Sequence, residues 1–596
     1  MRVGRTRAGA RGPGAVRGRA WRGVLEHRLP LARGAPRTQP QRGRSDHRPP
    51  ARLRLRLPHR LALRRPQAPD RGLRLLPRDG CHPARDHAPR SVWRARKGAA
   101  ARAPAARVDV ARRRDVDLPE HRRDRPRLPQ LVGGAVTIST PSRPPFGRTV
   151  PGNRWDLADA DGADGGASAR SVSVIVAHFE QQAELDRTIA ALARQTHPTQ
   201  LMEVIVVDDG SRVPPTVPAD VRVLAQENLG FRAGSARNLG ARAATGDILC
   251  FLDADTSPEP DYVARMAALP SSLPEAVVAG HRKHADFTGV DVDAPVETAG
   301  PARELTEPSW LASAYRASRD LLDADDRSYR FVIGAVFSCT RWFFDETGGF
   351  DEDFLGYGGE DWDWASRAWL AGAVLAHEPL AVAWHDGPDW AGRSSGDAKR
   401  QEQKNGETLL LAQKIGVVGS RPRALRTVAA DVVAVLASAP SDGAAFICVD
   451  SLLEQLPHAS VVVPAEMHPL FAADPRVLSA SGPIPRGRVR IDVDAAVRFG
   501  SPVRSVQETG AATGTESPAV GSTALQDAAA RVGSSDLGAV RIGEHVTVRS
   551  ERALRREERW GESAGWRTEL VTDDTVRPLP ADVSVAAHLG GWLSLD

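Results

Sequence analysis

The sequence predicts an α/β protein built on a mostly parallel sheet with helices on both faces. Two observations lead to this prediction: from residue 170 onward strands alternate with helical segments, and the strands are continuous runs of Val, Ile and Leu. Strands that are apolar on both sides and alternate with helices are typical of parallel sheets. In such sheets the ligand site lies beyond the carboxyl ends of the strands.

The first elements follow one another closely. An apolar, β-branched strand over 171–179 precedes a helix over 183–195, in which Leu185, Ile189 and Leu192 recur at helical spacing. Further strands are expected at 202–211, 221–226 and 247–255, with a helix over 234–244. Acidic residues end two of these strands, which points to a site at that edge of the sheet.

The pattern continues less regularly to the end of the chain. A helix is expected after Pro260, and further elements are a strand at 276–280, a loop over 283–303, a strand at 331–340, a helix at 361–372 and one or two strands over 374–385. A new alternation of helix and strand begins near residue 421, whereas 501–540 is rich in Gly, Ser, Thr and Ala and is expected to be loop-like. The predicted domains are therefore 168–420 and a smaller α/β module over 425–596, which has no recognisable active site.

The first 135 residues differ in composition from the rest. Residues 1–130 carry 36 basic and 10 acidic side chains, whereas the remaining 466 residues carry 44 basic and 64 acidic ones. This Arg- and Pro-rich stretch lacks any helical or strand period, so we predict disorder. Three interpretations stay open: an over-extended start in GC-rich, bacterial coding with the true start near Val136, a solvated tail, and a nucleic-acid-binding arm. Without interleaved aromatic residues the last is the least favoured.

Composition excludes other classes of protein. In 596 residues, 41% of them hydrophobic, no run of 18 apolar residues occurs, which excludes a membrane-spanning helix. The N-terminus also lacks the features of a secretory signal. Four scattered cysteines support neither a disulfide framework nor a zinc site. A reducing, cytoplasmic location is expected, with peripheral association at the inner face of the membrane as an option.

Two acidic clusters follow neighbouring strands. Asp253 and Asp255 lie on one side of an extended chain, and a divalent cation, Mn²⁺ or Mg²⁺, would neutralise them. Capping of the helix after Pro258 or Pro260 is the structural alternative. Asp209, preceded by Asp208 and followed by Gly-Ser, fits either turn chemistry or a contact to a base or ribose.

A helix start and a glycine-rich segment supply further candidates. Arg232, Arg237 and Asn238 lie at the start of a helix and form either a diphosphate cradle or a solvated face. Gly358 and Gly359 precede Glu360-Asp361 at another helix start, where the helix dipole favours an ionised carboxylate that can serve as a general base.

Aromatic residues and a histidine surround this segment. Trp362 is one of six tryptophans between residues 342 and 390, which suit sugar stacking or, for any single ring, core packing. His385 ends a strand and is either a structural residue or a metal ligand.

Four stretches, in this order, resemble the family-two glycosyltransferases of GT-A fold: VSVIVAHFEQ, VIVVDDGS, GFRAGSARNLGARAATGDILCFLDAD and FLGYGGEDWDW. The last is similar to the acceptor-side motif of β-1,4-galactosyltransferases, polypeptide N-acetylgalactosaminyltransferases and chondroitin polymerase. The resemblance covers about residues 170–400. It implies an inverting hexosyl- or N-acetylhexosaminyltransferase that uses a nucleotide-diphosphate sugar, with UDP favoured, in polysaccharide synthesis.

The same resemblance implies a role for each matching residue. Asp361 matches the catalytic base, with Glu360 beside it at the glycan or glycoconjugate acceptor. Asp209 and Arg232 match nucleotide-binding residues. The remaining matches concern the metal site: Asp253 and Asp255 match the metal- and ribose-binding pair, and His385 matches a histidine that completes the metal site in several members. The alternative is a non-catalytic nucleotide-sugar-binding or regulatory protein that retains the fold.

Overall fold

The computed structural model describes residues 143–158, 169–356, 358–388, 397–427, 429–500 and 522–590. The basic segment 1–135 lies outside these ranges, so the three interpretations of it stay open. The described residues belong to one compact unit, Arg123–Asp596. None of the helices in the described ranges combines the length and apolarity that crossing a membrane requires.

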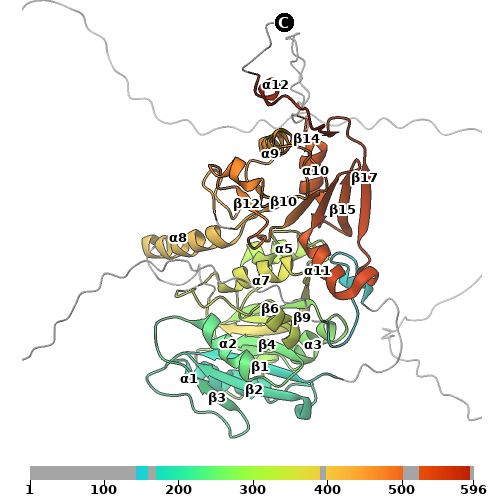
Figure 1. Ribbon diagram of the computed structural model, residues 1–596. Helices are drawn as coiled ribbons and strands as arrows, with labels where there is room; N and C mark the ends of the chain where they lie inside the picture. The colour runs from blue at the N-terminus through green and yellow to red at the C-terminus, as the bar shows by residue number, and fades with distance from the viewer. Residues whose placement is uncertain are drawn as a thin grey trace, which may run out of the picture. The chain divides into compact units, whose positions relative to one another are not determined.

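Four parallel strands form one half of a large sheet (Figure 1). They are β1 (Val172–His178), β2 (Met202–Asp208), β3 (Arg222–Ala225) and β4 (Ile248–Asp253). The central strand β1 pairs with β2 on one side and β4 on the other, so that His178 lies opposite Asp208 and Ala177 opposite Asp253. The parallel pairing brings the two acidic strand ends to one edge of the sheet, as the sequence predicts.

Helices cover both faces of this half. They are α1 (Gln182–Leu192), α2 (Ala233–Ala243) and α3 (Tyr262–Ser272). Along β1, Val174 and Val176 face a core shared with α1 and α3, whereas Ile175 faces a core shared with α2. Helix α2 approaches very closely, because a Cβ atom at Gly240 would lie 2.5 Å from the Ile175 side chain.

The other half of the sheet contains antiparallel as well as parallel pairs of strands. Its strands are β5 (Thr256–Pro258), β6 (Ala276–Ala285), β7 (Glu304–Leu305), β8 (Val336–Thr340) and β9 (Val374–Asp386). Strand β8 lies between β4 and β6 and is antiparallel to both, while β6 and β9 are parallel. The helices are α4 (Val296–Ala302), α5 (Ser309–Ala317), α6 (Arg341–Glu346), α7 (Glu360–Leu370) and α8 (Asp397–Lys414).

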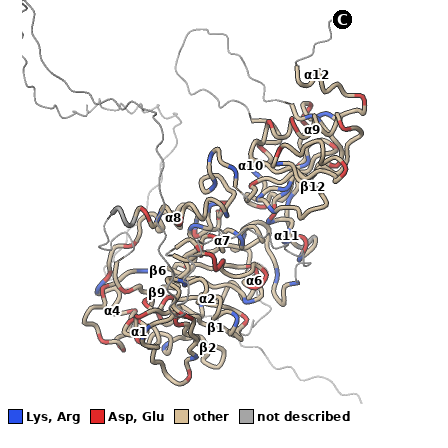
Figure 2. Tube along the Cα trace, turned by 60° about the vertical axis from the view of Figure 1, so that its left-hand side comes forward, with Lys and Arg blue, Asp and Glu red and all other residues tan. Residues whose placement is uncertain are grey.

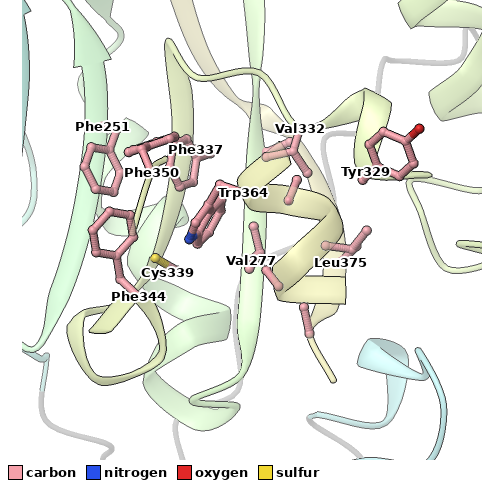
Figure 3. Close-up of a cluster of buried hydrophobic side chains, with 14 of the residues drawn as sticks. Phe251, Val277, Tyr329, Val332, Phe337, Cys339, Phe344, Phe350, Trp364 and Leu375 are labelled. Carbon is pink, nitrogen blue, oxygen red and sulfur yellow. The ribbon is translucent and has the colours of Figure 1, made fainter. Parts of the chain in front are cut away.

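An aromatic cluster joins α7 to the sheet (Figure 3). Trp364 of α7 packs against Phe337 of β8 with ring centroids 4.9 Å apart, and Phe337 stacks on Phe251 of β4 at 4.6 Å. Trp364 is fully buried, as are Trp369 and Trp384. Core packing is therefore confirmed for these three tryptophans.

The C-terminal module is also α/β, as predicted. Its main sheet contains β10 (Val432–Leu436), β11 (Ser460–Val463), β12 (Val477–Ser479), β13 (Val489–Val493), β15 (Leu537–Ile542), β16 (Val546–Ser550) and β17 (Arg567–Val571). Two short strands, β14 (Val497–Arg498) and β18 (Arg577–Pro578), pair with each other. The helices are α9 (Asp442–Gln455), α10 (Ala524–Arg531), α11 (Glu551–Trp560) and α12 (Val585–Leu589).

Three local expectations need correction. The loop expected over 283–303 contains the end of β6, which pairs with β9, and helix α4. The segment 331–340 is a strand only from residue 336, because Gly334 turns its backbone N–H toward α7. The part of 501–540 that the structure describes contains α10, with a capping box at Thr523, and the start of β15.

Candidate functional site

The two aspartates at the end of β2 have different surroundings. Asp208 accepts hydrogen bonds from the Ser211 backbone N–H and hydroxyl group and lies 3.1 Å from His178 Nδ1. Asp208 therefore stabilises the turn after β2, which is one of the two functions that the sequence analysis considered for this acidic pair. Asp209 accepts from Gln226 Nε2 at 2.6 Å and from the Arg232 backbone N–H at 2.8 Å, so it holds the chain that leads into α2.

Arg232 is the N-cap residue of α2 and Arg237 lies within the helix, and their guanidinium groups have different partners. The Arg232 guanidinium donates to the Glu227 carbonyl group at 2.7 Å. Arg237 is buried and donates to Asp253 at 2.6 Å and to Glu360 at 3.0 Å. Arg237 is thus the link between the end of β4 and the start of α7, and its guanidinium is committed to two carboxylates.

Asn238, the neighbour of Arg237, faces another way. Its amide donates to the Phe350 carbonyl group at 2.9 Å and to Glu352 at 3.0 Å, and its oxygen accepts from the Phe350 backbone N–H. The side chain therefore fixes the chain that leads toward the glycine-rich segment.

Glycines place the acidic start of α7. Gly358 and Gly359 have φ angles of +91° and +97°, which non-glycine residues rarely adopt, and α7 begins directly afterwards. Its first turn holds Glu360, Asp361 and Asp363, and a stretch of acidic chain lies beside α7 in Figure 2. The helix start that the sequence predicts for the Glu360-Asp361 pair is confirmed.

Both carboxyl groups are buried enough to change their pKa. Asp361 accepts from the Gly334 backbone N–H at 3.0 Å and from its own neighbour Trp362 at 2.8 Å. Burial raises the pKa of Asp361 above its ordinary value, although the Gly334 N–H and Arg237 oppose the shift. Burial and the nearby Asp361 raise the pKa of Glu360, again against Arg237. Glu360 Oε2 is buried and makes no hydrogen bond within the described structure.

Asp255 and His385 meet at the edge formed by β5 and β9. His385 Nε2 lies 3.5 Å from Asp255 Oδ2, and Gln181 donates to the same carboxylate at 3.1 Å. His385 Nδ1 faces the Gly387 carbonyl group at 3.2 Å.

A carboxylate and an imidazole are a donor set that fits Mn²⁺ or Mg²⁺, which take few protein ligands and complete their coordination with substrate phosphate. Among the described residues, no group of three or more His, Cys, Asp or Glu side chains is placed to hold a metal ion by itself. The capping alternative for the Asp253–Asp255 pair is wrong, because α3 begins only at Tyr262, after Asp261.

One cleft of about 620 Å³ joins several of these residues. Asp253, Arg237, Gly358, Gly359, Glu360, Asp361 and Trp362 line it together with residues from other elements. Asp209, Arg232, Asn238, Asp255 and His385 are not among the lining residues of this cleft. The structure therefore places the end of β4 and the start of α7 in one cavity, while Asp209 and the Asp255–His385 pair lie outside its lining.

Some lining residues were missed by the sequence reasoning. These are Phe231, Arg282, Trp310, Gln403, Lys404 and Glu407. The last three come from α8, where Lys404 bonds Glu407 at 2.7 Å and lies 4.7 Å from the centre of the Trp362 ring. The helical composition of residues 397–414 could have predicted α8, but no sequence pattern shows that it lies against Trp362. Trp390 lies outside the described residues.

Comparison with known proteins agrees with the resemblance drawn from the four stretches. Residues 173–306 match the family model described as "Glycosyl transferase family 2", and residues 321–379 match "N-terminal domain of galactosyltransferase". The hyaluronan synthase of Pasteurella multocida is 28% identical over 268 residues, which are 41% of this chain and 27% of that protein. The validoxylamine A glucosyltransferase of Streptomyces hygroscopicus subsp. limoneus is 32% identical over 216 residues, 32% of this chain and 46% of that protein.

The chain thus spans less than half the length of these two relatives. Among solved structures, a mannosyltransferase from Pyrobaculum calidifontis in complex with GDP-Man and Mn²⁺ is 17% identical, with a TM-score of 0.31, over 44% of this chain and 66% of that one. A score this low adds nothing to the fold described above. The resemblance itself is confirmed: residues 173–306 match the model of glycosyl transferase family 2, and residues 321–379 match a galactosyltransferase model.

Proposed function

We propose that the chain is an inverting glycosyltransferase. It would move a hexosyl or N-acetylhexosaminyl group from a nucleotide-diphosphate sugar, with UDP favoured, to a hydroxyl group of a glycan or glycoconjugate. The observation that carries the proposal is the shared cleft, in which Asp253 from the end of β4 and Asp361 from the start of α7 both expose side chains. The relatives named for hyaluronan synthesis and glucosyl transfer favour a saccharide acceptor, as in polysaccharide synthesis.

Asp361 is the proposed general base. It would take the proton of the acceptor hydroxyl group as that oxygen forms a bond to the anomeric carbon. The bond from the anomeric carbon to the diphosphate oxygen breaks at the same time, and its electron pair leaves with the diphosphate. Burial raises the proton affinity of Asp361, which strengthens it as a base, while the Gly334 N–H bond fixes its direction.

Glu360 and Arg237 would hold the other groups of the cleft in place. Arg237 ties Glu360 to Asp253, so the acceptor side and the donor side keep a fixed separation. The unbonded Glu360 Oε2 is available to accept a hydrogen bond from an acceptor hydroxyl group. Asp209 and Arg232 would position the nucleotide from the neighbouring strand end. Asp255 and His385 would hold the divalent cation, which when bound neutralises charge on the departing diphosphate.

The test is the substitution Asp361→Asn. A panel of UDP- and GDP-sugars with MnCl₂ is first screened for thermal stabilisation of the full chain, because a ligand that binds the native state raises its melting temperature. With the donor so found, release of nucleoside diphosphate should fall by about 10²- to 10⁴-fold in D361N, while the thermal shift persists. The control is Asp353→Asn. Asp353 lies in the loop that precedes α7, and its side chain is 82% exposed.

Two results would count against the proposal. If D361N keeps its turnover, Asp361 is not the base. If wild-type chain is stabilised by a nucleotide sugar yet never turns it over with any saccharide acceptor, the non-catalytic binding protein becomes the better description.

A further inference from the structure

The two large sheets have the same topology. Numbered in chain order without the short strands, the first sheet contains β1, β2, β3, β4, β6, β8 and β9, and the second β10, β11, β12, β13, β15, β16 and β17. In both sheets the spatial order is third, second, first, fourth, sixth, fifth and seventh. In both, the sixth strand is antiparallel to its two neighbours and every other pair is parallel.

A smaller feature repeats as well. After the fourth strand of the first sheet, β5 pairs antiparallel with the end of the seventh strand, β9. After the fourth strand of the second sheet, β14 pairs antiparallel with β18, which follows the seventh strand. Such agreement in order, direction and short strands indicates that the C-terminal module repeats the fold of the first domain.

The pairing register shows what the second copy has lost. Val172 opens the first sheet's central strand and pairs with Ile248, while Val432 opens the second's and pairs with Val489. Counting from these pairs, Asp494 occupies the place of Asp253. The place of Asp255, the proposed metal ligand, is taken by Ala496, a buried methyl group that cannot bind a cation.

The acceptor side is also missing. In the first domain residues 341–373 join the sixth and seventh strands and contain α6, the glycine turn and α7. In the second module the connection is residues 551–566, about half as long, and it contains α11 directly after the strand. No counterpart of α7 and its Glu360-Asp361 pair exists among the described residues of this connection.

Helix α11 instead contacts the far end of α7. Three of its arginines, Arg552, Arg556 and Arg559, are buried. Arg559 donates to the Ala371 carbonyl group, Arg556 to Gly372 at 2.7 Å and Ala373 at 3.1 Å, and Arg552 to Ala373 at 3.0 Å. Arg552 also covers the Trp369 ring of α7, 3.2 Å from its centre. These carbonyl groups belong to the C-cap of α7 and to the two residues that follow it, so the arginines fix the chain where the helix ends.

We propose that residues 429–590 are a silent second copy of the glycosyltransferase domain, and that α11 of this copy positions the catalytic helix α7. The copy binds no donor, so the two sheets of the described residues carry one donor site between them. Its arginines hold the C-terminal end of α7, which keeps Glu360 and Asp361 fixed at the other end. The silence of the copy rests on the proposed function, whereas the positioning of α7 does not.

Hydrogen–deuterium exchange of the full chain tests the positioning. In Arg556→Ala the amides of 360–371 should exchange about tenfold faster or more, since the lost bonds are charge-assisted, while those of 172–178 should not change. Arg556→Lys, which keeps the charge, should show a smaller effect and serves if the alanine variant does not fold. Arg555→Ala is the matched control, because the hydrogen bonds of Arg555 lead to Glu551 and Glu558 of its own helix.

Equal exchange of 360–371 in the wild type and both Arg556 variants would overturn the positioning role, as would equal acceleration in 172–178. In steady-state kinetics, R556K should lower kcat with little change in the donor KM, since α7 carries the base and not the donor site.

Calorimetric titration with UDP or GDP and MnCl₂ tests the silence of the copy. One equivalent should bind, Asp255→Ala should abolish binding, and Asp494→Ala should leave it unchanged. Two equivalents, or binding that D494A removes, would overturn the proposal. If the wild type binds neither nucleotide, the proposed function fails, and the exchange experiment still decides the role of α11.

Discussion

Replacing Arg237 by methionine should destabilise the protein strongly, because this arginine neutralises a buried carboxylate. The side chains of Arg237 and Glu360 are 4% and 8% exposed and are joined at 3.0 Å. A second bond, at 2.6 Å, leads to Asp253, which is 34% exposed and so can be solvated after the substitution. Glu360 has no such relief, since burial and the adjacent Asp361 both raise its pKa.

The expected loss follows from the burial of the pair. Removing one partner of a buried ion pair costs about 3–5 kcal/mol, because the remaining charge is left without a counter-charge. Glu360→Gln in the R237M background removes that charge and should restore about 2 kcal/mol. Without Arg237 the pKa of Glu360 rises further above its unfolded value, so the folded state takes up a proton. The pKa of Glu360 is already raised to about 7 in the wild type, so both folded proteins bind this proton below pH 7 and the loss should change little there. Above pH 7 the loss should grow by about 1.4 kcal/mol for each pH unit until the pH passes the further raised pKa of the variant.

Urea unfolding followed by tryptophan fluorescence measures these differences at pH 5 and pH 8. The matched control is Arg242→Met on the same helix, where a 61% exposed arginine pairs with a 49% exposed Glu352, a contact worth about 1 kcal/mol or less. A cost of R237M no greater than that of R242M would refute the neutralising role of Arg237. So would a lack of any recovery at pH 8 when E360Q is added to R237M.

Three shorter predictions concern other parts of the first domain and the module. Gly359→Ala would place a side chain at a φ of +97°, so the urea midpoint should fall by an amount equivalent to about 1–3 kcal/mol; an unchanged midpoint would contradict the strain. Asn153→Ala removes two hydrogen bonds to the Leu375 backbone, both 2.8 Å long, and one further hydrogen bond. Calorimetry should therefore show that the free energy of unfolding falls by about 3 kcal/mol, and a fall below about 1 kcal/mol would contradict this prediction. Burial raises the pKa of Cys250 and Cys448 to about 12, so iodoacetamide at pH 8 should label both only after unfolding, as mass spectrometry can check.

The parallel half of the sheet could be predicted from sequence because its information is local. The run 171–179 contains the observed β1, and the helix expected over 234–244 differs from α2 by one residue at each end. Strands β1 and β4 are buried on both faces and therefore continuously apolar, whereas the edge strand β3 is mostly exposed. The end of β6 could not be predicted, because His284 is in a strand through its pairing with His385 and with Leu305, both of which lie outside its own segment.

The candidate site also contains features that the sequence predicts and features that it does not. The acidic strand ends and the glycine-rich start of α7 are visible in the sequence, since each needs only a strand end or a helix start. Arg237 was expected either to contribute to a diphosphate cradle or to lie on a solvated face, and its bonds to Asp253 and Glu360 depend on the tertiary approach of α2 to α7. The same applies to Lys404, whose position near Trp362 depends on the packing of α8.

The comparison of the two sheets separates what a fold supplies from what a site requires. Strand order and register recur in both copies, and in each an acidic residue, Asp253 or Asp494, lies at the end of the fourth strand. The proposed metal ligand and the proposed general base do not recur. The position of the ligand is occupied by Asp255 in the first copy and by Ala496 in the second. The base lies in a segment between the sixth and seventh strands that the second copy lacks. Because that connection in the second copy contributes buried arginines to the end of α7 instead of a carboxylate to a cleft, the two copies would act as one catalytic unit. In the proposed enzyme, catalysis would then depend on both domains, although only one of them would hold the reacting groups.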